Sequence, residues 1–275
     1  MRVLVTGAAG MLGRDLVPHL APRHDVTAVD LEVDVTDPGA VRDCVRDCRP
    51  DAVVHLAAWT DVDGAEARED EAAAVNAVGA GNVAAAAAEA GAALVVPSTD
   101  YVFDGRKGAP YAEDDPPSPL SVYGRTKLAG ERAALARHPD GTRIARTAWL
   151  YGAGGRNFVD TMLRLGAERE AVDVVDDQVG SPTWTRDLAP ALEALLALPP
   201  GVYHTAGAGA VSWAGLAAAV FEEAGLACRV RPIATARLGR PAPRPALSAL
   251  AVTRPGAPRL RDWREALRDY LGEVS

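Results

Sequence analysis

Short β-branched runs alternate with alanine- and leucine-rich windows along the first half of this 275-residue chain. Strands are expected at residues 2–6, 26–29, 52–56, 93–97 and 143–147, with helical windows between them. Such alternation implies parallel strand pairing through right-handed crossovers, with helices on both faces of the sheet. The expected fold class is therefore α/β, with a doubly wound parallel sheet.

A glycine-rich turn follows the first expected strand. Gly7, Gly10 and Gly13 occupy this turn, just before an amphipathic window. Glycine lets the backbone approach a pyrophosphate closely, and the following helix start offers free N–H groups to it. The turn predicts a Rossmann-type dinucleotide-binding domain over residues 1–150; a tight turn with no ligand is the alternative reading.

Asp30 ends the second expected strand, about twenty residues after the turn. A carboxylate there can accept hydrogen bonds from the adenosine ribose and would repel a 2′-phosphate. No lysine or arginine occurs in residues 31–36, so the sequence favours NADH, although Arg14 could permit NADPH. An ordinary strand-end aspartate is the alternative reading.

Tyr123 and Lys127 lie four residues apart, on one face of an expected helix. A lysine charge near a phenol favours the phenolate and is expected to bring this tyrosine toward a working pKa. Thr99 stands at the end of the fourth strand, where ligands of open α/β sheets bind. Thr99, Tyr123 and Lys127 together predict proton delivery to a carbonyl group.

Further residues are expected along the cofactor. Asp34 and Val35 would flank the adenine, small residues at Leu56, Ala57 and Ala58 would pass the nicotinamide side, and Asn76 would order backbone or water near the site. A satisfied core amide is an equal alternative for Asn76. The complete predicted cofactor set is Gly7, Gly10, Met11, Leu12, Asp30, Asp34, Val35, Leu56, Ala57, Ala58, Thr60, Asn76, Tyr123 and Lys127.

Composition and charge exclude some classes of binding partner. The net charge of −8 without a basic stripe argues against nucleic acid or an acidic membrane, so a small molecule is the expected ligand. Three cysteines are too few for a disulfide framework, and Cys44 and Cys48 are expected as reduced thiols on a helix. Neither a signal peptide nor an apolar run of membrane-spanning length is visible, so we expect a cytoplasmic protein.

After residue 150 the pattern loosens, and a smaller substrate-binding lobe is expected over residues 151–275, with some segments returning to the main sheet. Helices are expected near 157–167, 184–198, 212–224 and 262–271, and strands at 172–175 and 202–204. The window 66–90 predicts one long alanine-rich helix. Residues 237–258 contain five prolines and are expected to form a loop over the ligand.

Several stretches resemble the dTDP-4-dehydrorhamnose reductase family of extended short-chain dehydrogenases/reductases. The resemblance lies in the glycine turn and in six further segments, Ala57-Ala58-Trp59-Thr60-Asp61-Val62-Asp63, Ser98-Thr99-Asp100-Tyr101-Val102-Phe103-Asp104-Gly105, Tyr123-Gly124-Arg125-Thr126-Lys127, Arg146-Thr147-Ala148-Trp149-Leu150-Tyr151-Gly152, Asn157-Phe158 and Asp177-Gln178-Val179-Gly180-Ser181-Pro182-Thr183. Related dehydratases carry a glutamate base where this chain has Tyr101, so simple reduction is favoured.

The resemblance implies reduction of the C4 ketone of a dTDP-linked 4-keto-6-deoxyhexose with NADH or NADPH. It implies that Tyr123 protonates the alkoxide, that Thr99 hydrogen-bonds the same oxygen, and that Lys127 lowers the tyrosine pKa and holds the nicotinamide ribose. It also implies a sugar pocket, for which plain core is the alternative at one member, Trp149. The implied pocket residues are Val62, Asp100, Tyr101 and Trp149.

The chain also departs from the family pattern. The family's arginine–proline motif carries an asparagine and a serine that touch the nucleotide. This chain reads Arg244-Pro245-Ala246-Leu247-Ser248, so leucine stands in the asparagine position, and the nucleotide or sugar could differ from the housekeeping substrate. Some members bind magnesium at a dimer contact through glutamates, but Asp15 stands at one such position, and no metal ligand is assigned here. A homodimer is compatible with the resemblance. Two other functions stay open, a nucleotide-sugar epimerase and a non-catalytic dinucleotide-binding regulatory subunit.

Overall fold

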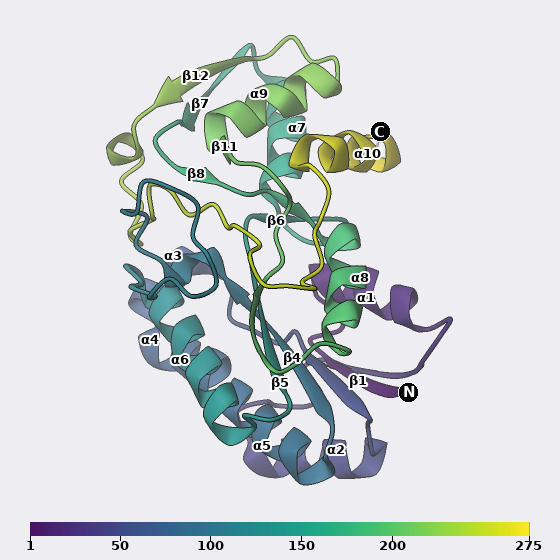
Figure 1. Ribbon diagram of the computed structural model, residues 1–275. Coiled ribbons are helices and arrows are strands. Elements are labelled where there is room, and N and C mark those ends of the chain that lie inside the picture. The colour runs from purple at the N-terminus through teal and green to yellow at the C-terminus, as the bar shows by residue number, and fades with distance from the viewer. Residues whose placement is uncertain (275) are drawn as a thin grey trace.

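The computed structural model describes residues 1–274 and is built on a parallel six-stranded sheet (Figure 1). The order across it is β10-β5-β4-β3-β1-β2, and every neighbouring pair is parallel. The strands are β1 (Arg2–Thr6), β2 (Asp25–Val29), β3 (Ala52–His55), β4 (Ala93–Thr99), β5 (Thr142–Thr147) and β10 (Gly201–His204). The α/β prediction is confirmed, and all five strands expected in the first half are present.

Helices cover both faces of the sheet, because successive residues of each strand point to opposite sides. Val3 and Val5 of β1 belong to a core with α1 (Met11–Leu20) and α8 (Thr185–Leu195). Leu4 between them belongs to the opposite core, with α2 (Pro38–Cys48), α5 (Ala80–Ala90) and part of α6 (Val122–Arg137). Figure 1 shows these two helical layers on either side of the strands.

The chain reverses its direction of travel across the sheet at β1. Strand β2 lies on one side of β1, and β3, β4 and β5 follow on the other. At such a switch point the loops leaving neighbouring strands diverge and open a crevice at their carboxyl ends. The glycine turn after β1 and the segment after β3 both border this crevice.

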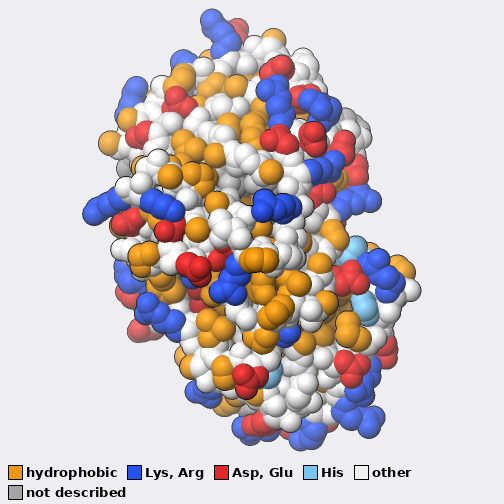
Figure 2. Space-filling model, in the orientation of Figure 1, with side chains coloured by type: hydrophobic (Ala, Val, Ile, Leu, Met, Phe, Trp, Pro, Cys, Tyr) orange, Lys and Arg blue, Asp and Glu red, His pale blue; other side chains and the backbone are white. Residues whose placement is uncertain are grey.

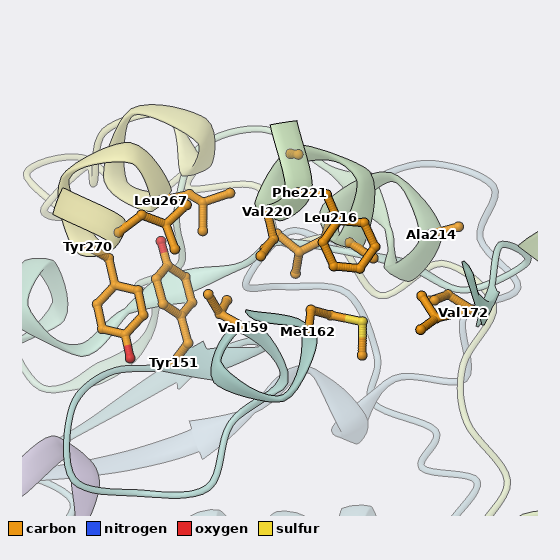
Figure 3. Packing of buried hydrophobic residues seen from close by; sticks show 14 of the residues in the cluster. Tyr151, Val159, Met162, Val172, Ala214, Leu216, Val220, Phe221, Leu267 and Tyr270 are labelled. Atoms are coloured by element: carbon orange, nitrogen blue, oxygen red, sulfur yellow. The ribbon is translucent and has the colours of Figure 1, made fainter. Parts of the chain in front are cut away.

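The second lobe has a separate hydrophobic core. Figure 3 shows Tyr151, Met162, Phe221, Leu267 and Tyr270 packed together between α7, α9 and α10. The elements of this lobe are α7 (Phe158–Glu168), β7 (Ala171–Val175), α9 (Trp213–Glu223), β12 (Arg229–Ile233), α10 (Trp263–Val274), the two-residue strands β6 (Leu150–Tyr151), β8 (Val179–Gly180), β9 (Thr183–Trp184) and β11 (Val211–Ser212), and the short turn η3 (Thr235–Arg237). The small strands and β12 escaped prediction because their runs are too short or too polar to show a period.

The prediction of one continuous helix over residues 66–90 is wrong in detail. The chain forms α3 (Val62–Ala67), α4 (Glu69–Ala73), the π-helical segment η1 (Ala74–Gly79) and then α5. Arg68 leaves helical geometry between the first two, with φ −135° and ψ 49°. The wider η1 turn accompanies the Asn76 side chain, which bonds the Trp59 backbone and Thr126 instead of solvent. Tertiary contacts therefore override the uniform alanine propensity.

The proline-rich segment is a loop, as predicted, and we call residues 238–258 the strap. It crosses from the second lobe to the end of β4 (Figure 1). Isolated bridges join Leu247 to Val179 and Leu250 to Tyr111. Arg240 and Arg244 of the strap both form ion pairs with Asp63 on α3. The strap is thereby tied to both lobes.

Charged side chains of both signs mingle on the face shown in Figure 2, including a group over α9 and α10. Arg264 and Arg268 of α10 form ion pairs with Glu223 of α9 there. Cys44, Cys48 and Cys228 are free thiols, and burial raises the pKa of Cys44 to about 11. Within residues 1–274, no helix is long and apolar enough to cross a bilayer.

Candidate active site

The amino terminus of α6 carries the predicted tyrosine and lysine to the end of β4. Ser121 caps this helix by accepting from the Gly124 N–H at 3.1 Å. A Cβ on Gly124 would lie 2.2 Å from the Tyr101 carbonyl oxygen, so only glycine permits this approach of α6 to η2 (Asp100–Val102). Helical spacing then places Tyr123 and Lys127 one turn apart on the face toward β4.

Tyr123 stands edge-on to Tyr101, with ring centroids 5.7 Å apart and an interplanar angle of 76°. Burial raises the pKa of Tyr123 to about 12, against a smaller opposing effect of its hydrogen bond with Thr99. The expected lowering by Lys127 is not found: the only opposing effect comes from Thr99, while burial and the Asp100 charge both raise the pKa. The phenol is therefore fully protonated near neutral pH and is placed to act as an acid.

The Lys127 ammonium is fixed from the sheet side. Its Nζ donates to the Pro97 carbonyl oxygen of β4 at 2.9 Å. Burial lowers the pKa of Lys127 to about 8, and the nearby Glu131 charge opposes that shift. His55, at the end of β3, has a pKa lowered to about 3 by burial and by the Lys127 charge, so this imidazole is neutral. Between Lys127 and His55, it is therefore Lys127 that supplies positive charge at the ends of β3 and β4.

Thr99 ends β4 and is held in a chain of hydroxyl contacts. Its Oγ1 donates to Asp100 Oδ1 at 3.1 Å and accepts from the Tyr101 N–H at 3.2 Å. The second Asp100 oxygen, Oδ2, accepts from the strap hydroxyl of Ser248 at 2.5 Å. Burial raises the pKa of Asp100 to about 7, although both hydroxyl bonds favour the carboxylate.

The glycine turn forms a cradle that fits a pyrophosphate. Gly7 has φ +68°, and a Cβ there would lie 2.5 Å from the Ala57 nitrogen. A Cβ on Gly13 would lie 2.3 Å from the Ala8 carbonyl oxygen, so the start of α1 packs tightly on the turn. Gly10 precedes α1 without a side-chain cap, which leaves backbone N–H groups at the helix start for an anion.

A cavity of about 690 Å³ adjoins this cradle, between α1, the end of β2 and the Gly154 loop. Asp30 and Glu32 line it, and Arg14 is the cation among its lining residues. Asp30 Oδ2 accepts from the Ala9 N–H at 2.7 Å, while Arg14 Nε donates to the Ala9 carbonyl at 3.1 Å. Acidic side chains therefore border the place where an adenosine ribose would lie.

The remaining predicted cofactor residues are divided between the crevice and the core. Asp34 caps a turn by accepting from the Thr36 N–H and hydroxyl, while Val35 is buried in the α2–α5 core. Asn76 is 3% exposed and bonds both backbone groups of Trp59 and the Thr126 hydroxyl, so it orders backbone beside the crevice and is at the same time a satisfied core amide. Met11, at the start of α1, is partly exposed, and Leu12 behind it is buried. The loop after β3 carries the partly exposed Leu56, Ala57 and Ala58 and the exposed Thr60.

The predicted sugar-pocket residues differ in how much of each side chain is available to a ligand. Val62 begins α3 and is partly exposed, and Tyr101 packs on Tyr123. Asp100 is 1% exposed, with both oxygens already bonded inside the protein. Trp149 stacks flat on Trp213, with centroids 3.4 Å apart, so at most one indole face remains for a ligand.

Sequence reasoning missed a buried ion pair behind the lysine. Glu131 lies one further turn along α6 from Lys127 and accepts from Arg146 Nε at 2.9 Å and Nη2 at 2.7 Å. Ser98 also donates to Glu131, at 2.5 Å. The signal was present, because Tyr123, Lys127 and Glu131 follow at successive spacings of four on one helix face.

Sequence reasoning also missed Arg244, the cation that faces Tyr101. Arg244 of the strap hydrogen-bonds Tyr101 and forms a two-bond ion pair with Asp63. Burial disfavours the Asp63 charge, but the bonds from Arg244 and its neighbours outweigh it and lower the Asp63 pKa to about 2. Asp15, at the position discussed for magnesium, accepts instead from Thr185 at 2.5 Å. Within residues 1–274, no group of three or more His, Cys, Asp or Glu side chains is arranged to hold a metal ion.

The glycine cradle, the switch-point crevice and the tyrosine–lysine pair define an α/β oxidoreductase of the Rossmann-type short-chain dehydrogenase/reductase class. The family model described as RmlD substrate binding domain matches residues 1–275. The chain belongs to this family, and the resemblance found in the sequence is confirmed.

Individual relatives agree with this assignment. The chain is 50% identical over 280 residues to a dTDP-4-dehydrorhamnose reductase of Streptomyces griseus, covering 98% of this chain and 92% of that protein. It is 47% identical to a probable dTDP-4,6-dihydroxy-2-methyloxan-3-one 4-ketoreductase of Streptomyces antibioticus, covering 100% and 96%. A crystal structure of the Bacillus anthracis dTDP-4-dehydrorhamnose reductase in complex with NADP superposes with a TM-score of 0.96 at 40% identity, covering 99% of each chain.

Proposed function

We propose that this protein reduces the C4 ketone of a dTDP-linked 4-keto-6-deoxyhexose in deoxysugar biosynthesis, using a nicotinamide dinucleotide. The observation that carries this proposal is the meeting of Thr99, Tyr123 and Lys127 at the end of β4, beside the glycine cradle. The named activities of relatives at 46–50% identity support the same reaction class.

The bound dinucleotide would supply hydride to the ketone carbon. Tyr123 would give its phenolic proton to the developing alkoxide, for which a fully protonated phenol is the required state. Thr99 would hydrogen-bond the same oxygen. Lys127, held by the Pro97 carbonyl, would bind the nicotinamide ribose.

NADH is the preferred cofactor in this proposal. Asp30 and Glu32 place negative charge beside the expected ribose, and a 2′-phosphate there would be repelled. Arg14 is the opposing cation, but its Nε is bonded to the Ala9 carbonyl. The NADP of the Bacillus anthracis structure belongs to that protein. The ratio of kcat/KM for NADH to that for NADPH tests the preference, and Asp30→Ser should lower the ratio.

Four further assignments remain proposals. Residues 1–150 would bind the cofactor and residues 151–275 mainly the sugar nucleotide, although β10 and α8 of the second half complete the main sheet. Val62, Asp100, Tyr101 and Trp149 would line the sugar pocket. A cytoplasmic location and a homodimer stay predictions, which fractionation and sedimentation would test.

The decisive experiment follows oxidation of the reduced cofactor at about 340 nm with a dTDP-4-keto-6-deoxyhexose as substrate. Tyr123→Phe should lose at least about a hundredfold in kcat. Tyr203→Phe is the matched control, since the Tyr203 hydroxyl bonds the Pro199 carbonyl away from the crevice. Tight dinucleotide binding without turnover would instead indicate a regulatory subunit, and retained NAD without net oxidation would indicate an epimerase.

A further inference from the structure

Thr99 has one hydroxyl proton, and its hydrogen-bond partners determine which acceptor receives it. The Thr99 hydroxyl donates to Asp100 Oδ1, its oxygen accepts from the Tyr101 N–H, and the Tyr123 phenol hydrogen-bonds the same hydroxyl. A hydroxyl donates a single hydrogen bond. As long as Asp100 is a carboxylate, it is the strongest acceptor for the Thr99 proton, ahead of the neutral Tyr123 phenol and of the ketone oxygen of a substrate.

Asp100 lies where a carboxylate is costly. The residue is 1% exposed, and none of the ion pairs within residues 1–274 includes it. Its two oxygens are bonded by two neutral hydroxyls, those of Thr99 and Ser248, and by the backbone N–H groups of Asp100 and Tyr101, so no cation is among its partners. Burial without a paired cation favours the protonated acid, and it raises the pKa of Asp100 to about 7.

We propose that Asp100 is a positioning residue that sets the direction of the Thr99 proton, and that Thr99 donates to the substrate ketone only when Asp100 is protonated. This inference rests on the proposed function. Protonated Asp100 donates from Oδ1 to Thr99 Oγ1, which reverses the 3.1 Å bond. Oδ2 continues to accept from Ser248, and the Thr99 proton turns to the ketone oxygen. Asp100 keeps its proton, and the alkoxide proton still comes from Tyr123.

The strap is part of this arrangement, because Ser248 is its contact with Asp100. The Ser248 hydroxyl stabilises the carboxylate form, so loss of this bond shifts Asp100 toward the acid. The other groups around Asp100 are the phenols of Tyr101 and Tyr123, with Arg244 reaching Tyr101 from the strap and Lys127 beyond on α6. Among these groups, only Lys127 has a pKa close to that of Asp100, at about 8. The experiments must therefore separate the ionisation of Asp100 from that of Lys127.

Infrared titration of the free protein tests the acid directly and needs no turnover. A protonated buried carboxyl gives a C=O stretch band that disappears on ionisation. We expect a band that titrates with a midpoint near pH 7 in the unmodified protein and is absent in Asp100→Asn. Ser248→Ala should move the midpoint to higher pH. A carboxyl band with no component titrating above about pH 6 would overturn the proposal.

The pH dependence of kcat/KM provides the second test. In the unmodified enzyme, kcat/KM should be constant below pH 7 and fall about tenfold per pH unit above it, which gives a break near pH 7. Ser248→Ala should move this break to higher pH. Asparagine in Asp100→Asn reproduces the hydrogen-bond pattern of the acid, with its amide N–H toward Thr99 and its oxygen toward Ser248. That variant should lose the break and retain only the Lys127 limb near pH 8.

The outcomes distinguish this inference from the function on which it rests. A purely structural role for Asp100 predicts lower rates at every pH with the break unmoved, and that result would refute the inference. If no dTDP-keto-sugar is reduced by the unmodified protein, the proposed function fails, while the infrared titration still decides whether Asp100 is protonated near neutral pH. Ser248→Ala serves as the second variant should Asp100→Asn fold poorly.

Discussion

A single added methyl group tests how α6 is seated behind the active site. Gly130 of α6 faces the π-helical segment η1, and a Cβ on it would lie 2.1 Å from the Asn76 carbonyl oxygen. That oxygen belongs to the backbone and has no rotamer by which to move aside. The substitution Gly130→Ala must therefore displace η1 or α6 by about 1 Å to restore contact distance.

The expected magnitude follows from two opposing contributions. Alanine gains about 1 kcal/mol of helix propensity over glycine in a helix interior. Overpacking against a fixed backbone costs about 1–3 kcal/mol, and the strained hydrogen bonds of Asn76 to Trp59 and Thr126 add to it. We expect a net loss of about 2 kcal/mol in the free energy of unfolding, and a Tm lower by about 5 °C.

The matched control is Gly81→Ala on α5. The nearest atom to its added Cβ is Ala133 Cβ at 3.4 Å, an ordinary contact, so the helix-propensity gain should dominate and raise the stability by about 0.5–1 kcal/mol. Urea unfolding followed by circular dichroism, with thermal melts, measures both variants. Equal stability of the two alanine variants would refute the close seating of α6 on η1.

Three further perturbations probe the site. Glu131→Gln leaves the Arg146 guanidinium buried without its charge partner, and we expect about 3–5 kcal/mol of destabilisation in urea unfolding; a change below about 1 kcal/mol would argue against the buried pair. Arg244→Ala should speed hydrogen exchange in the strap more than Arg240→Ala, because the Arg244 side chain is 11% exposed and that of Arg240 is 56% exposed. Lys127→Arg should move the activity limb near pH 8 to higher pH, because guanidinium stays charged there; an unmoved limb would assign it to another group.

Much of the cofactor half could be predicted from local pattern alone. Buried parallel strands are short continuous apolar runs, as in Val53 and Val54 of β3, and they alternate with helical windows that force right-handed crossovers. The glycine turn is similarly local, because its backbone geometry depends on residues seven to thirteen and on their place after a strand. Tyr123 and Lys127 were placed on one helix face by spacing alone, and the structure agrees.

The electrostatic state of the site could not be predicted in the same way. Spacing indicated that Lys127 would lower the pKa of Tyr123, but burial raises that pKa to about 12. Desolvation depends on every atom packed around a group, and those atoms come from strands, helices and the strap far apart in sequence. Asp100 illustrates this most clearly, since its partner Ser248 lies 148 residues away.

The sequence by itself determined the parallel α/β sheet, the glycine cradle and the three residues gathered at the end of β4, because strand alternation, glycine geometry and helical spacing are local. Only the tertiary structure decided that the alanine-rich window breaks into a π-helical turn at Asn76, that Trp149 is covered by Trp213, and that Asp100 is enclosed between Thr99 and the strap. These are properties of packing, and packing is set by which distant segments meet.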